Sequence, residues 1–139
     1  MALKEIQDKI EKLPSLKYYD IEEFVKFDGD ADRLTDDLGE KDIKPTQLRK
    51  FFSALKEIEL YVKDNGWDDT AKVNFYLLMP KIAYAKGRKV ISQRFYIFMK
   101  TAMNRVGSGK KEDTLEDFYR LVQFLESIIA FYKLKYSDS

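Results

Sequence analysis

The spacing of apolar residues near the C-terminus is the strongest constraint on what this chain can fold into. From residue 114 onward they recur at intervals of three and four, at Leu115, Phe118, Val122, Leu125, Ile129, Tyr132 and Tyr136. This period is that of one apolar face of an α-helix that packs almost parallel to its neighbours. Leu121, Ile128 and Phe131 widen the face, so the helix either lies at the centre of a bundle or shares its seam with another copy of the protein.

The helical period recurs along the rest of the chain, and no strand-like alternation competes with it. Pro80 predicts a kink or break within one of the expected helices. Asp113 followed by Glu116 predicts a capping box for the last one. The acidic, turn-rich stretch DGDADRLTDDLGEKD, residues 28–42, predicts a surface loop. We therefore expect an all-α protein, a compact bundle of about five to six helices in a single domain over residues 1–139. The expected helices span residues 3–13, 20–27, 45–64, 70–86, 90–106 and 114–135.

The composition excludes most enzyme classes. The 139 residues include no cysteine and no histidine, which removes thiol nucleophiles, disulfides, histidine-ligated metals and Ser-His-Asp triads. Asp28, Asp30 and Asp32 resemble the start of a calcium loop, but the positions that require Gly and Glu hold Arg33 and Gly39. No other catalytic constellation has supporting spacing. We expect no enzyme activity, no catalytic residues, no metal site and no cofactor.

The formal net charge of +1 conceals a strong polarity along the chain. Residues 1–42 carry 7 basic and 13 acidic side chains, whereas residues 43–111 carry 15 basic and 5 acidic ones, and residues 112–139 are again acidic. Between residues 70 and 111 there are ten basic residues and no acidic one. Because exposed charges are screened beyond about 8 Å, a polyanion would respond to the basic middle rather than to the total. The alternative is that the acidic ends fold over the middle and neutralise it.

Two segments combine basic and aromatic or polar residues in the manner of a nucleic-acid contact. They are KPTQLRK at residues 44–50 and KIAYAKGRK at residues 81–89. Since most of the aromatic residues lie at core spacing, the pattern favours contact with the phosphate backbone over base reading. Tyr84 either packs its ring under Arg88 or joins the core. The expected RNA-binding residues are Arg49, Lys50, Lys56, Lys81, Tyr84, Arg88 and Lys89.

Four stretches in order resemble a known family. KPTQLRKFF, YLLMPKIAYAKGRK, FYIFMKTAMNRV and DFYRLVQFLESIIAFYK are similar to segments of the small subunit of the type III-A CRISPR–Cas effector, the Csm complex. The resemblance covers residues 43–134 as the family-like helical core, and it does not extend to the acidic residues 1–42, where that family varies. Arg49 and Lys50 match its RKF-like stretch, and Lys81, Tyr84 and Arg88 match its second motif. Lys86 replaces a small residue there.

The resemblance implies a non-catalytic helical protein of antiviral defence. Such subunits stack in several copies along the duplex of guide RNA and target RNA inside a ribonucleoprotein complex, and they help to monitor or stabilise pairing. The implied partners are both RNAs, the repeated backbone subunits, the large signalling subunit and other copies of the same protein.

A second hypothesis comes from another class of protein. The chain would be a helical adaptor whose basic face binds an acidic protein, without nucleic acid.

If copies of the protein stack along RNA, we expect the acidic ends of the chain, including Asp36, Asp37 and Asp42, to face neighbouring copies. The sequence has no apolar run long enough for a transmembrane helix and does not begin like a signal peptide, so we expect a cytoplasmic protein without a membrane partner.

Overall fold

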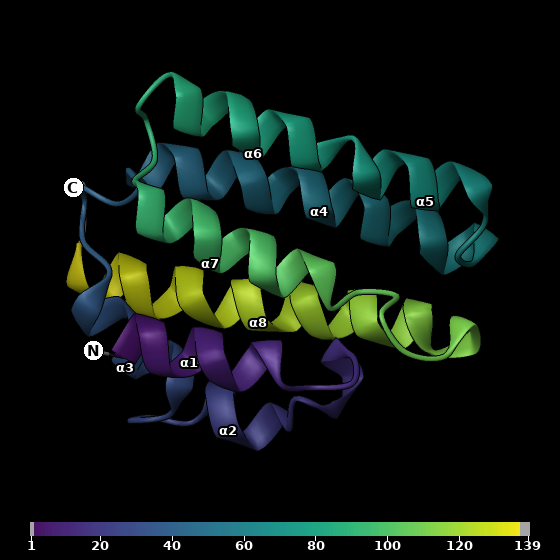
Figure 1. Ribbon diagram of the computed structural model, residues 1–139, viewed down its shortest axis with the longest axis horizontal. Helices are drawn as coiled ribbons and strands as arrows, with labels where there is room; N and C mark the ends of the chain where they lie inside the picture. The colour runs from purple at the N-terminus through teal and green to yellow at the C-terminus, as the bar shows by residue number, and fades with distance from the viewer. Residues whose placement is uncertain (1, 137–139) are drawn as a thin grey trace.

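The computed structural model describes residues 2–136 and is all-α over that range (Figure 1). The only β-type pairing among these residues is one isolated bridge between Ile43 and Ile91. The α-helices outnumber the expected five to six because residues 30–37 form an additional short helix and the expected helix 70–86 is divided in two. The elements are α1 (Ala2–Glu11), η1 (Leu16–Tyr18), α2 (Ile21–Val25), α3 (Asp30–Asp37), α4 (Pro45–Asn65), α5 (Asp69–Tyr76), α6 (Leu78–Gly87), α7 (Gln93–Asn104), η2 (Lys111–Asp113) and α8 (Thr114–Lys135).

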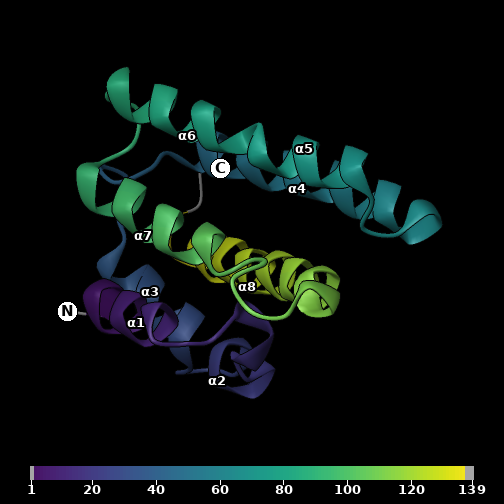
Figure 2. The ribbon, with the colours of Figure 1, turned by 45° about the vertical axis from the view of Figure 1, so that its right-hand side comes forward.

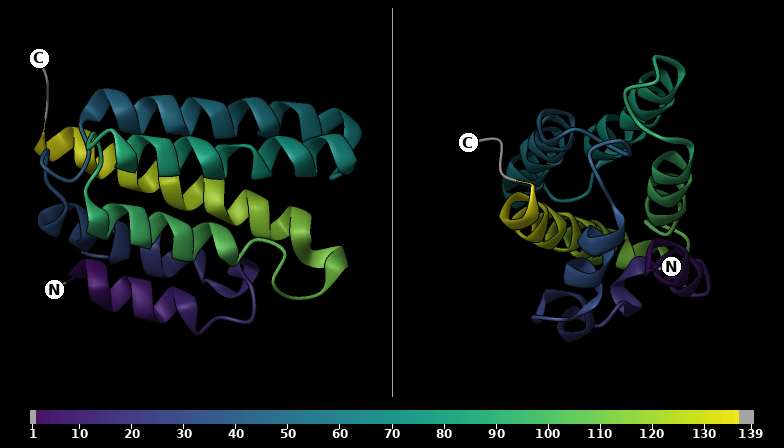
Figure 3. Two further views of the ribbon diagram at one scale, coloured as in Figure 1. Left: turned by 45° about the horizontal axis from the view of Figure 1, so that its top comes forward. Right: turned by 90° about the vertical axis from the view of Figure 1, so that its left-hand side faces the viewer.

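Helix α8 is the central element of the bundle. It packs against α3 and α4 and also against η1 and α2 (Figure 3). Its seam residues Phe118, Val122, Leu125 and Tyr132 are buried within the chain, and Leu115, Ile129 and Tyr136 are half-buried against the same core. The central-helix interpretation is therefore confirmed, and most of the seam is already covered by the chain itself.

The acidic stretch 28–42 is not the surface loop that its composition predicts. Residues 30–37 form α3, whose contacts lie with α1, α2 and α8. Ala31, Leu34 and Leu38 recur at helical spacing and are buried in the common core. The surrounding carboxylates find cations from elsewhere in the chain, for example Asp32 with Lys135 at 2.6 Å. Burial of this apolar stripe stabilises the helix despite its acidic surface.

Pro80 divides the expected helix 70–86 as its position predicts. Helix α5 ends at Tyr76 and α6 begins at Leu78, so the break falls three to four residues before the proline. Proline lacks the N–H that would bond the carbonyl of Tyr76, and its ring crowds that carbonyl. The break turns α6 relative to α5 while both still run alongside α4 (Figure 1).

The caps of the helices follow the sequence at some ends and not at others. Asp20 caps α2 and Asp68 caps α5, each through a hydrogen bond from a backbone N–H of the first turn. The capping box expected at Asp113 is wrong: its side chain makes no cap hydrogen bond and instead pairs with Lys17 at 2.9 Å. That ion pair anchors the start of α8 to η1.

One apolar cluster runs from α1 to α8 and joins the acidic N-terminal part to the rest of the chain. Its centre contains two aromatic groups. Tyr19, Phe24 and Phe124 have ring centroids 4.8–5.2 Å apart. Phe75 and Phe118 form the second group with Trp67. None of the helices in residues 2–136 has both the length and the apolar character needed to cross a membrane.

Candidate nucleic-acid interface

A cavity of about 290 Å³ lies between α4, α6 and α7, and we call it the α4–α6 cavity. Its walls are mostly apolar, and no acidic side chain lines it. The cations on its wall are Lys50 from α4 and Lys81 from α6, both exposed. The structure therefore brings together two of the predicted RNA-binding residues that lie far apart in sequence. The apolar lining includes Phe51, Ile82, Ala85, Phe95 and Met99.

The predicted residues of α6 form one exposed stripe beside this cavity. Lys81, Tyr84 and Arg88 follow at intervals of three and four; Arg88 is the C-cap residue directly after α6, and Lys89 comes next. The guanidinium carbon of Arg88 lies 5.6 Å from the centroid of the Tyr84 ring. Tyr84 is 67% exposed, so its ring packs under Arg88, and the alternative that it joins the core is wrong. A cation held over a ring keeps its charge facing outward.

Arg49 and Lys56 do not join the group around the α4–α6 cavity. Lys56 donates to Glu59 at 2.6 Å and lies over the ring of Phe52. The hydrogen bond to Glu59 raises the pKa of Lys56 above its ordinary value. Arg49 lies on the other side of α4, beside Lys133 near the end of α8. Arg49 and Lys56 are seven residues apart and share one stripe of α4, whereas Lys50 also lines the cavity. Arg49 and Lys50 meet at a shallow hollow on the surface of α4.

The cations around the α4–α6 cavity lack carboxylate partners among residues 2–136. No carboxylate of residues 2–136 lies within 4.0 Å of the charged nitrogens of Lys50, Lys81, Arg88 or Lys89. Among the basic residues of the stretch 70–111, Arg94 is the one that forms ion pairs with carboxylates of residues 2–136. The alternative that the acidic ends neutralise the basic middle therefore holds at Arg94 and fails around the cavity.

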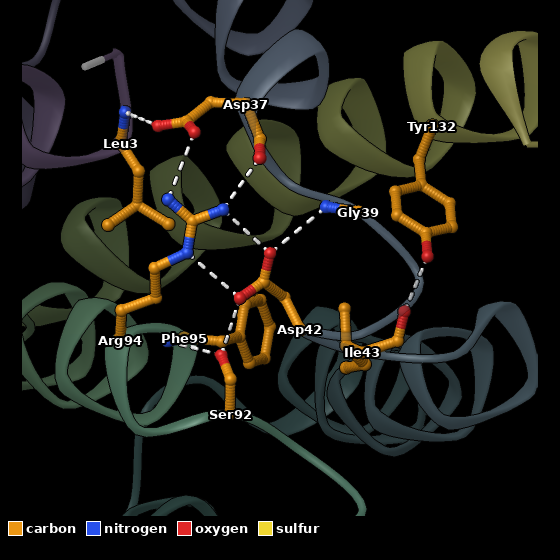
Figure 4. Close-up of polar contacts among 9 residues, drawn as sticks. All are labelled: Leu3, Asp37, Gly39, Asp42, Ile43, Ser92, Arg94, Phe95 and Tyr132. Carbon is orange, nitrogen blue, oxygen red and sulfur yellow. Dashed lines mark hydrogen bonds and ion pairs between the residues drawn. The ribbon is translucent and has the colours of Figure 1, made fainter.

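Arg94 is a structural residue that the sequence did not single out (Figure 4). Its Nε and Nη2 donate to the two oxygens of Asp42 at 2.9 and 2.7 Å, and its Nη1 donates to Asp37 at 2.9 Å. Asp42 also accepts hydrogen bonds from Ser92 and from the Gly39 N–H. Burial alone would raise the pKa of Asp42, but the hydrogen bonds from Arg94, Gly39 and Ser92 outweigh it and lower the pKa to about 2.

This cluster corrects the role expected for the acidic ends. Asp37 and Asp42 are buried against Arg94 and tie the segment between α3 and α4 to α7, so they do not face neighbouring copies. Asp36 alone of the three is exposed, and it pairs with Lys135 at 2.8 Å. The hydrogen bond of the Tyr132 hydroxyl to the Ile43 carbonyl fixes the same segment to α8 (Figure 4).

No group of three His, Cys, Asp or Glu side chains in the described residues has the arrangement of a metal site. In the stretch that resembles a calcium loop, the carboxylate of Asp30 is buried and bonds Lys9 and Tyr19. Asp32 bonds Lys135 and the Asp28 N–H. These carboxylates therefore serve the packing of α3.

The sequence of the chain matches a known protein family. A family model described as Csm2 Type III-A matches residues 19–138. The chain belongs to this family. It is thus a type III-A CRISPR small subunit, as the four sequence stretches indicated. The Csm2 match begins at residue 19, so it includes α2 and α3, which the resemblance read from the sequence did not reach. No curated protein and no solved structure matches the chain.

Proposed function

We propose that this Csm2 protein is a non-catalytic subunit that binds the RNA backbone inside a type III-A interference complex. It would stack in several copies along the duplex of guide and target RNA and help to stabilise or monitor their pairing. Its other partners would be the repeated backbone subunits and the large signalling subunit, and the complex would operate in the cytoplasm.

The observation that carries the proposal is the set of basic side chains around α6 that lack a carboxylate partner in residues 2–136. A cation with no internal partner contributes its full charge to the local potential, which attracts phosphates and releases their counterions on binding. Arg88 and Lys89 are the main proposed phosphate contacts, since they lie at the exposed end of α6. Lys50 and Lys81 add positive potential beside them. Arg49 and Lys56, on the other stripe of α4, remain secondary candidates.

The proposed contact suits an RNA whose sequence is read by base pairing rather than by protein. The exposed α6 stripe offers charge and one aromatic ring, Tyr84, and it lacks the row of stacking rings that readers of unpaired bases use. A protein of this kind recognises the backbone and shape of a duplex.

A titration of fluorescent RNA by anisotropy tests the proposal at about 50 and 200 mM salt. The double variant Arg88→Glu/Lys89→Glu should bind about tenfold more weakly and flatten the salt slope by about one to two units. The control Lys12→Glu/Lys41→Glu changes the net charge equally at exposed lysines elsewhere and should bind like the wild type. Equal losses in both double variants would show that only total charge matters. Absence of any binding at low salt, alone and with the assembled partner subunits, would favour the adaptor hypothesis.

A further inference from the structure

We propose that the turn around Phe27 of one copy inserts into the α4–α6 cavity of the next copy. The inference rests on the stacking in the proposed function and names the two surfaces that meet. Phe27 is 84% exposed, the largest exposure among the big apolar side chains of the described residues. Its ring meets Phe131 edge to face, with the centroids 6.3 Å apart, and leaves most of its surface to water, where an aromatic anchor of a partner contact would lie.

The turn that carries Phe27 is held rigidly in this exposed position. Asp28 has a φ of 64°, in the left-handed region, and its N–H donates to Asp32 at 2.8 Å. The Gly29 N–H bonds the Lys26 carbonyl, and a Cβ on Gly29 would lie 2.8 Å from the Glu23 carbonyl oxygen. A backbone in a costly conformation, fixed by its own hydrogen bonds, presents its side chain without a large loss of entropy on binding.

The α4–α6 cavity matches such a ring in size and chemistry. Its volume of about 290 Å³ exceeds the roughly 150 Å³ of an apolar cavity that accommodates benzene, so a phenyl ring fits with room for a neighbouring methyl group. The wall is formed by apolar side chains such as Phe51, Ile82 and Phe95. Val25, which is also exposed and lies two residues before Phe27, supplies the methyl groups.

The charges around the two surfaces are complementary. The lining of the cavity contains Lys50 and Lys81 and no carboxylate. The exposed Glu22 and Asp28 flank the Phe27 turn, whereas Glu23 is already paired with Lys9 at 2.9 Å, and Lys26 is a further cation beside them. Insertion would bring these carboxylates to the two lysines and leave Arg88 and Lys89 to RNA. A second copy of this chain is therefore the occupant whose charge and shape fit the cavity.

The helices that carry the two surfaces lie on opposite sides of α8. Helix α2 and the turn that follows it lie below α8 in Figures 1 and 2, whereas α4 and α6 lie above it. A contact between two different surfaces is heterologous, so it joins copies head to tail into a row, or into a ring where the rotation closes, rather than into a symmetric dimer. This is the geometry that a stack along RNA requires.

Sedimentation of the full chain at up to about 1 mM tests the inference by complementation. The wild type should form dimers and larger species that weaken with salt. Phe27→Ala, which removes the ring, and Ala85→Phe, which fills the cavity, should each associate at least about tenfold more weakly. An equimolar mixture of the two variants should restore a dimer and nothing larger, because each variant keeps one intact surface.

Controls separate this inference from misfolding and from the proposed RNA contact. Leu134→Ala removes another side chain that is 75% exposed and should associate like the wild type. Lys50→Glu/Lys81→Glu reverses two exposed charges and gives a second cavity variant if Ala85→Phe proves unstable. Phe27→Ala should keep its RNA affinity, and Arg88→Glu should keep its self-association, so either proposal can fail alone. A monomeric wild type, association of Phe27→Ala equal to wild type, or a folded mixture that stays monomeric would overturn the inference.

Discussion

Replacing Asp42 by Asn tests whether the Arg94 cluster holds the acidic N-terminal part to the helical core. The Asp42 side chain is 3% exposed and accepts four hydrogen bonds, two of them from Arg94. Asn keeps the shape but removes the charge and places an NH₂ group where an oxygen accepted hydrogen bonds. The variant therefore leaves the Arg94 guanidinium with Asp37 as its remaining carboxylate.

The expected loss can be estimated in two ways. Removing one partner of a buried pair costs about 3–5 kcal/mol, and the remaining bond to Asp37 favours a value of about 3 kcal/mol. With a urea slope of about 2 kcal/mol/M, the unfolding midpoint at pH 7 should fall by about 1.5 M. The lowered pKa gives a second figure: the shift from 3.8 to about 2 corresponds to about 2 kcal/mol of pH-dependent stability.

The sign of the pH dependence follows from the direction of the shift. Because the pKa of Asp42 is lower in the folded state than in the unfolded state, its contribution is fully present above about pH 5. It is lost as the pH falls through 3.8 and then through about 2. Between pH 5 and pH 2 the wild type should therefore lose about 2 kcal/mol more free energy of unfolding than Asp42→Asn does.

Urea unfolding followed by circular dichroism at pH 7, 5 and 2 provides the assay. Asp36→Asn is the matched control, since Asp36 lies in the same segment and pairs with Lys135 but is 70% exposed. Its effect should stay below about 1 kcal/mol. A midpoint for Asp42→Asn within about 0.2 M of the wild type, or an unchanged pH dependence, would refute the reasoning.

Three further substitutions test other parts of the fold by thermal unfolding. Gly29→Ala should cost about 1–3 kcal/mol, because its Cβ would lie 2.8–2.9 Å from backbone carbonyl oxygens, and a wild-type melting temperature would contradict this close approach. Asp68→Ala removes the cap of α5 and should cost about 1 kcal/mol, whereas Asp69→Ala, next to it in the first turn, should change stability by less than about 0.5 kcal/mol. Tyr132→Phe loses the hydrogen bond to the Ile43 carbonyl and should cost about 1 kcal/mol, and an effect near zero would show that this bond does not hold the segment before α4.

The long helices were predictable from the sequence because their apolar period is strong and their ends are marked. Helix α4 begins at Pro45 and ends before Gly66, and α8 carries its apolar seam along its whole length. The break before Pro80 follows from backbone chemistry alone. These features depend on local chain properties, which a sequence displays directly.

The features that the sequence did not predict depend on contacts between distant residues. Helix α3 was missed because its composition is acidic, and the cations that stabilise it, Lys9 and Lys135, come from α1 and α8. The sequence around Arg94 does not differ in kind from that around Arg88. Arg94 is nevertheless held by Asp37 and Asp42, whereas Arg88 has no carboxylate partner in residues 2–136. The feature of the sequence nearest to Arg94 that marks this region is Ser92, which caps the start of α7.

The most direct measurement of the central claim is purification of the tagged chain from its native host, followed by analysis of the RNA and proteins that accompany it. We expect guide RNA of discrete length together with the other subunits of a type III-A complex. We also expect cross-links between RNA and the end of α6, near Arg88 and Lys89. Recovery of the chain with an acidic protein and without RNA would contradict it.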